Sequence, residues 1–219
     1  MATADYRLLL TDYCSLPSPM GISSQQFDQM KSRVAGARRT PSRVIEDLRP
    51  ATAHQVVLGI DPSLRGTGYG VLHFDRKQPR VLAQGTIRAK TTWERSRCLV
   101  QITHTLRDII RLHKPTVCII EGLFFAQNIQ TALIMGEARG ASLVAAAEAG
   151  LEIYEMAPRK VKQAIVGYGA AQKLAVAKMV QRMLHLAESP ASDAADALAL
   201  ALTYAQENGR YSATPRKRI

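Results

Sequence analysis

The stretch that most constrains the fold is VVLGIDPSLRGTGYG, which runs from Val56 to Gly70. Its apolar, β-branched start predicts a buried strand over residues 56–60, and the strand ends in an aspartate, Asp61. A glycine-rich turn follows, and then a second strand is expected over residues 69–74. An unpaired carboxylate at the end of a buried strand costs several kcal/mol, so such a group is paired, protonated or bound to metal. The rest of the chain must therefore supply a partner for Asp61.

The order of the remaining elements predicts the architecture. Further strands are expected over residues 80–89, 116–120 and 151–156, and helices over residues 94–112, 131–149, 157–166, 170–186 and 192–204. Three strands joined by short connections, followed by strands that alternate with helices, favour a mixed sheet with helices on both faces. The sequence therefore predicts a three-layer α/β domain with a five-stranded sheet over residues 54–206.

Both ends of the chain differ from this domain. Residues 1–53 show weak periodicity and carry a basic cluster of Lys31, Arg33, Arg38, Arg39 and Arg43. We interpret them as a flexible basic extension, which is either a phosphate-contacting arm or a solvated tail without a special role. Residues 207–219 are predicted to be a basic, disordered tail.

Composition narrows the class of partner. The formal net charge is +11, which favours a polyanion such as nucleic acid, although a merely basic protein is the alternative. The three cysteines form no C-x-x-C motif and the five histidines show no metal-ligand spacing, so a structural zinc site is not expected. No signal peptide or membrane-spanning run is recognisable, so we expect no membrane association and a cytoplasmic location.

Four carboxylates interrupt otherwise apolar segments. Asp61 ends the first strand, Glu121 ends the fourth, and Asp193 and Asp196 share one face of the last helix. Taken singly, each has an ordinary interpretation: a loop cap for Asp61, an arginine partner for Glu121, and a helix N-terminal acid for Asp193. Brought together, they would require raised pKa values or hard divalent cations such as Mg²⁺ or Mn²⁺. Two such ions about 4 Å apart are the usual arrangement for phosphodiester hydrolysis.

A basic run follows the fifth strand. It contains Arg159, Lys160, Lys162, Lys173 and Lys178. Such a run is usually a solvated face, but beside an acidic metal cluster it becomes a candidate phosphate-binding surface.

Several motifs together resemble the RuvC-type Holliday junction resolvases of the ribonuclease H-like superfamily. They are LGIDPSLRGTGYGV, IIEGLFFAQN, MGEARGASLVAAA, PRKVKQAIVGYGAAQK and DAADALALAL, in order from about residue 56 to 204. The resemblance implies a ribonuclease H-like fold and a homodimer that makes paired symmetric nicks in four-way DNA junctions during recombination and repair. It also implies a RuvA–RuvB branch-migration complex as partner.

The resemblance assigns roles residue by residue. Asp61, Glu121, Asp193 and Asp196 match catalytic, metal-binding acids, which would hold two Mg²⁺ ions per subunit, with Mn²⁺ as a substitute. Phe124 matches an aromatic residue at the junction centre, and a ring there can stack on unpaired bases. Lys162 and Lys173 match lysines that meet DNA phosphate near the active site, and Arg159 lies in the same basic run.

The chain departs from the family pattern at Ser63-Leu64, Gly122 and Gln127, which bears on sequence preference more than on chemistry. Three other functions are compatible with parts of this sequence. The glycine-rich loop also looks like the phosphate loop of actin and Hsp70-like ATPases, but a second such domain is missing from this sequence. A ribonuclease H-like nuclease acting on structured RNA would carry the same acids, and a junction binder without cleavage would not need them.

Overall fold

The computed structural model describes residues 55–75, 78–122, 128–208 and 218–219 of the chain. The predicted basic extension over residues 1–53, Phe124, Gln127 and most of the predicted tail lie outside the described residues. In the described residues no helix combines the length and the apolar character that crossing a membrane requires.

Five strands form one mixed sheet in this part of the chain, in the order β3-β2-β1-β4-β5. Their bounds are β1 Val56–Asp61, β2 Gly66–Phe74, β3 Pro79–Arg88, β4 Val117–Glu121 and β5 Glu152–Met156. The first three strands pair antiparallel, whereas β4 is parallel to β1 and β5 is parallel to β4. The predicted mixed sheet is therefore confirmed.

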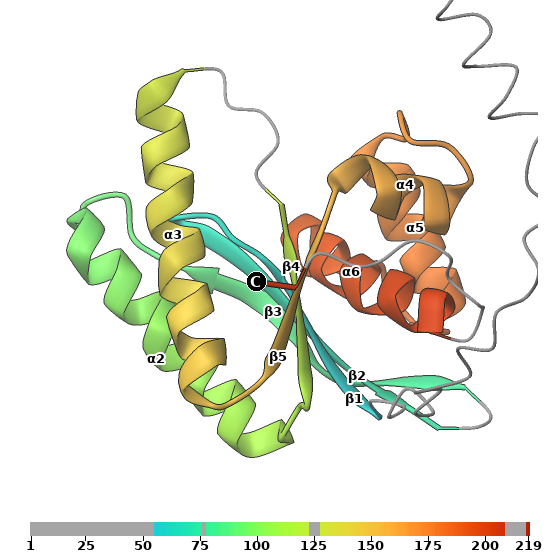
Figure 1. Cartoon of the computed structure of the whole chain (residues 1–219). Helices are drawn as coiled ribbons and strands as arrows, with labels where there is room; N and C mark the ends of the chain where they lie inside the picture. Colours follow the sequence, from blue (N-terminus) through green and yellow to red (C-terminus); the bar gives the residue numbers. More distant parts are fainter. Residues whose placement is uncertain (1–54, 76–77, 123–127, 209–217) are drawn as a thin grey trace, which may run out of the picture. The chain divides into compact units, whose positions relative to one another are not determined.

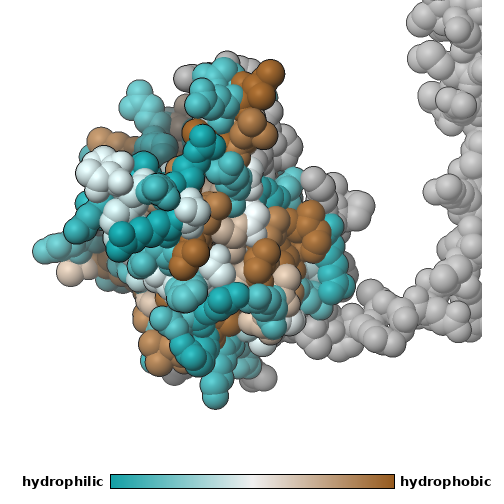
Figure 2. Space-filling model, turned by 90° about the vertical axis from the view of Figure 1, so that its left-hand side faces the viewer, coloured by the Kyte–Doolittle hydropathy of each residue, from teal (hydrophilic) through white to brown (hydrophobic). Residues whose placement is uncertain are grey.

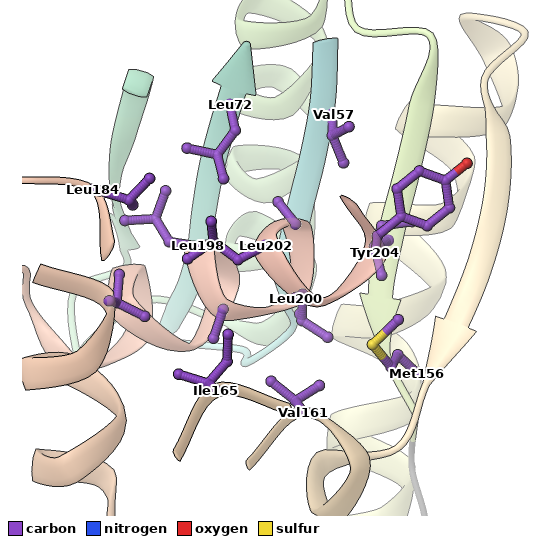
Figure 3. Close-up of a cluster of buried hydrophobic side chains, with 14 of the residues drawn as sticks. Val57, Leu72, Met156, Val161, Ile165, Leu184, Leu198, Leu200, Leu202 and Tyr204 are labelled. Carbon is purple, nitrogen blue, oxygen red and sulfur yellow. The ribbon is translucent and has the colours of Figure 1, made fainter. Parts of the chain in front are cut away.

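Helices cover both faces of the sheet (Figure 1). On one face lie α2 Arg95–His113 and α3 Ile129–Glu148, and on the other lie α4 Pro158–Val166, α5 Lys173–Met183 and α6 Ser192–Asn208. Alternate residues of a strand point to opposite faces of the sheet. Val57 and Ile119 pack toward α6, as Figure 3 shows for Val57. Leu58 and Ile120 pack toward α2 and α3. A fully buried side chain of this size contributes roughly 1.5–3 kcal/mol.

Glycines on β1 and β2 let α6 lie directly on the sheet. A Cβ atom added at Gly59 would lie 1.9 Å from the Ala197 carbonyl oxygen, and one at Gly68 would lie 2.0 Å from the Asp193 carbonyl oxygen. The turn predicted up to Gly68 is wrong, because β2 already begins at Gly66. Glycine is unfavourable in most strands, but here it permits the close approach of another backbone.

Element ends differ from the predictions by three or more residues in two further helices, α5 and α6. Helix α5 covers Lys173–Met183 rather than residues 170–186. The C-cap Gly167, with φ of 100°, ends α4 after Val166, and a short loop then leads to Gln172, the N-cap of α5. Helix α6 extends to Asn208, so the predicted tail begins inside the helix. At the other end of that tail, the Ile219 N–H donates to the Ile153 carbonyl oxygen at 3.1 Å on β5.

Candidate active site

One cavity of about 300 Å³ collects the acidic residues that the sequence singled out. Its lining includes all four predicted acids, Asp61, Glu121, Asp193 and Asp196, together with Lys162 and Lys173. The acids come from β1, β4 and α6, and the lysines come from α4 and α5. Residues more than 130 positions apart in the chain thus share one pocket.

The two strand acids meet because β1 and β4 are parallel neighbours. Ile60 is paired with Ile120, and the next residue on each strand is the acid that ends it. The carboxyl groups of Asp61 and Glu121 lie within hydrogen-bonding reach of each other. Two carboxylates at this separation cannot both ionise without strong repulsion, so a shared proton or a cation is required.

The two helix acids occupy the first turns of α6, which begins at Ser192. Both are half-buried, because the neighbouring alanines pack the helix tightly against β1 and β2. Lys173 Nζ at the start of α5 lies 3.2 Å from Asp196 Oδ2. Asp193 instead faces the β2–β3 hairpin, where the Thr86 hydroxyl lies 3.5 Å from its Oδ2 atom. No motif in the sequence pointed to Thr86.

The electrostatics of the pocket favour bound cations. Burial, followed by the charges of Glu121 and Asp196, raises the pKa of Asp61 to about 9. Burial likewise raises the pKa of Glu121. It also raises the pKa of Asp196, although the ammonium group of Lys173 opposes this effect. A pocket that disfavours its own negative charge gains most when positive charge enters it.

The donor set fits a hard divalent cation. All four acids offer carboxylate oxygens, which Mg²⁺ and Mn²⁺ prefer, and the lining contains no histidine or cysteine. Among the described residues, however, no three such side chains already stand as a ready-made metal site. Lys173 supplies the positive charge next to Asp196 in this arrangement. The residue types and their common pocket therefore fit a metal, while the side chains would have to turn toward it.

The other predicted contact residues divide in three ways. Lys162 and Lys173 line the pocket. Arg159 is exposed on the first turn of α4 and is not part of the lining, and its side chain packs over Gly169. Phe124 follows β4 but lies outside the described residues.

Known proteins resemble this chain in sequence. The family model described as "Crossover junction endodeoxyribonuclease RuvC" matches residues 57–204. The chain is 44% identical over 161 residues to the crossover junction endodeoxyribonuclease RuvC of Akkermansia muciniphila, covering 74% of this chain and 93% of that protein. It is 43% identical over 162 residues to the RuvC protein of Chromohalobacter salexigens, covering 74% and 87%.

Solved structures of Holliday junction resolvases have a similar fold. The RuvC protein of Thermus thermophilus in complex with a Holliday junction substrate matches with a TM-score of 0.67 and 33% identity, covering 76% of this chain and 100% of that one. The yeast mitochondrial Holliday junction resolvase Ydc2 matches with a TM-score of 0.51 and 11% identity, which shows a shared fold alone.

Proposed function

The chain belongs to the RuvC family of crossover junction endodeoxyribonucleases, and from this premise we propose how its own residues cut DNA. Its fold is the ribonuclease H-like α/β fold of that family, and its activity is the metal-dependent resolution of Holliday junctions. The observation that carries the assignment of residues is the single pocket in which four acids and two lysines meet.

Asp61, Glu121, Asp193 and Asp196 are the proposed metal ligands. We assign them two Mg²⁺ ions per subunit, with Mn²⁺ as a substitute, because two divalent charges would balance four carboxylates held in a half-buried pocket. When bound, such ions lower the pKa of a water molecule and stabilise the charge that develops on the leaving oxygen. Because the acids come from two strand ends and one helix, the backbone fixes where each carboxylate is anchored.

Lys162 and Lys173 are the proposed phosphate contacts inside the pocket. Both lysines line the same pocket as the four acids. A DNA phosphate that enters the pocket would therefore meet positive charge close to the proposed metal ligands. When metal and DNA bind, Lys173 would release Asp196 and pair with a DNA phosphate instead. Arg159, exposed at the start of α4, would contact the duplex outside the pocket. Phe124 stays predicted as the residue that stacks at the junction centre.

A homodimer is proposed because two symmetric cuts require two active sites. Helix α3 offers a face for this contact: Ile129 and Leu133 are 81% and 61% exposed, and Val144 is 49% exposed. Gly136 and Gly140 lie at matching positions along the helix, with open space where a side chain would be. Figure 2 shows this side of the molecule, formed by α2 and α3, with apolar patches among polar ones. A RuvA–RuvB complex as partner, in the cytoplasm, is proposed from the family alone.

The decisive experiment is cleavage of a synthetic four-way junction with Mg²⁺, comparing wild type with Asp61→Asn. We expect paired symmetric nicks with the wild type, and loss of nicking with retained junction binding in the variant. A linear duplex of the same sequence is the control substrate. Equal cleavage by the variant would refute the metal role of Asp61, and cleavage of structured RNA in preference to the junction would favour the alternative nuclease.

A further inference from the structure

The β2–β3 hairpin contributes to the acid pocket through a row of residues that crosses the sheet. Gly68 is paired with Asp61 on one side and with Thr86 on the other. Residues paired across adjacent strands project from the same face of a sheet. Thr86, Gly68 and Asp61 therefore stand in one line beneath α6.

Gly68, the middle residue of this row, has no side chain, and the backbone of α6 occupies the space above it. The backbone of Asp193 lies directly over Gly68, since a Cβ atom there would meet the Asp193 carbonyl oxygen at 2.0 Å. The Asp193 carboxylate also lies over Gly66, whose added Cβ atom would be 3.3 Å from Oδ2. Asp193 thus lies above the middle of the row, with Thr86 at one end and Asp61 at the other.

Thr86 provides a polar contact to the carboxylate of Asp193. Its hydroxyl donates toward Asp193 Oδ2 at 3.5 Å, across 107 positions of sequence. The second helix acid has a different partner, because Asp196 is paired with Lys173. A neutral donor orients a carboxylate without cancelling its charge, whereas an ammonium group competes with an incoming metal ion.

We propose that Thr86 is a positioning residue for the cleavage reaction: its hydroxyl holds the carboxylate of Asp193, which lies over Gly66, in the orientation that receives a divalent cation. This role rests on the proposed function of Asp193 as a metal ligand. It acts through Asp193 and involves no contact between Thr86 and the DNA.

The test compares Thr86→Val, which keeps the shape and removes the hydroxyl, with Thr86→Ser, which keeps the hydroxyl. The first measurement is thermal unfolding of the protein alone against Mn²⁺ concentration, and the second is the junction cleavage rate against Mn²⁺. We expect the half-maximal Mn²⁺ concentration to rise about 2- to 10-fold in Thr86→Val, the range for one hydrogen bond, and to stay near the wild-type value in Thr86→Ser. Thr103→Val, which removes a hydroxyl from α2 on the other face of the sheet, is the matched control and should leave both titrations unchanged.

Two results would overturn the proposal. Wild-type titrations for Thr86→Val would show that the hydroxyl has no role, and an equal loss in Thr86→Ser would show that the methyl group matters instead. The unfolding titration needs no cleavage, so it decides on Thr86 even if the wild type cuts no junction, a result that would refute the proposed function separately.

Discussion

Gly68→Ala should slow catalysis, because the absence of a side chain at Gly68 lets the first turn of α6 pack closely on β2. The new Cβ atom would lie 2.0 Å from the carbonyl oxygen and 2.4 Å from the carbonyl carbon of Asp193, both of them backbone atoms that cannot rotate away. Ordinary contact begins near 3.4 Å, so the first turn of α6 must move by about 1 Å or more. Overpacking of this kind costs about 1–3 kcal/mol, which outweighs the gain of about 0.4–1 kcal/mol from replacing a glycine in the unfolded chain.

The displacement falls on a proposed metal ligand, and a misplacement of about 1 Å at a reacting centre can cost about 100-fold in rate. We therefore expect a loss of roughly 100-fold in single-turnover junction cleavage and a loss of about 1–3 kcal/mol in urea unfolding. Gly136→Ala on α3 is the matched control for stability alone, because its Cβ atom would meet nothing within 4 Å in the subunit but lies on the helix face proposed for the dimer. It should stabilise the subunit by up to about 1 kcal/mol through helix propensity. Wild-type rate and stability in Gly68→Ala would refute the reasoning.

Three further predictions follow from burial and charge. In the metal-free protein the folded pKa of Asp61, about 9, lies above its ordinary value of 3.8, so the folded state binds more protons and stability falls as pH rises between these values. Asp61→Asn should flatten that fall in a series of melting temperatures, and an unchanged slope would contradict the burial argument. Leu133→Glu places a charge on the exposed apolar face of α3 and should shift the protein toward monomer in analytical ultracentrifugation, while an unchanged mass would argue for another interface. Arg139→Met leaves Glu155 buried without its arginine and should cost about 3–5 kcal/mol in urea unfolding, most of it recovered in the double variant with Glu155→Leu; no recovery would show that packing alone is responsible.

The positions of the strand acids could be predicted from the sequence because the cause is local. An apolar run that ends in an acid, as at Asp61 and Glu121, predicts a strand whose last residue reaches the edge of the sheet. The helix acids could be predicted in the same way, since Asp193 and Asp196 interrupt an alanine- and leucine-rich run at helical spacing. The family resemblance then indicated that all four belong together, and the pocket contains all four.

The contacts between elements could not be predicted, because they depend on how far apart two backbones lie. Gly66 and Gly68 suggested a turn, although alternate glycines are also typical of a strand beneath a closely packed helix. Thr86 had no recognisable signal, because only the register of β2 on β3 and the depth of α6 bring its hydroxyl to Asp193. The pairing of Lys173 with Asp196 likewise depends on where α5 begins, and that boundary was predicted three residues too early.

The close packing of α6 also bears on the metal binding proposed for the pocket. Small residues on both sides, glycines on the strands and alanines on the helix, bring the helix backbone onto the sheet and remove water from the carboxylates. The same closeness raises the pKa of Asp61, so the acids destabilise the metal-free fold while they prepare it for cations. Movement of α6 away from the sheet would relieve the repulsion, but it would also expose the buried apolar residues by which the helix packs on the strands. In the proposed mechanism, protons and the ammonium group of Lys173 balance this charge until metal and DNA phosphate take their place. A substitution that moves α6 away from the sheet should therefore weaken metal binding even when every acid is retained.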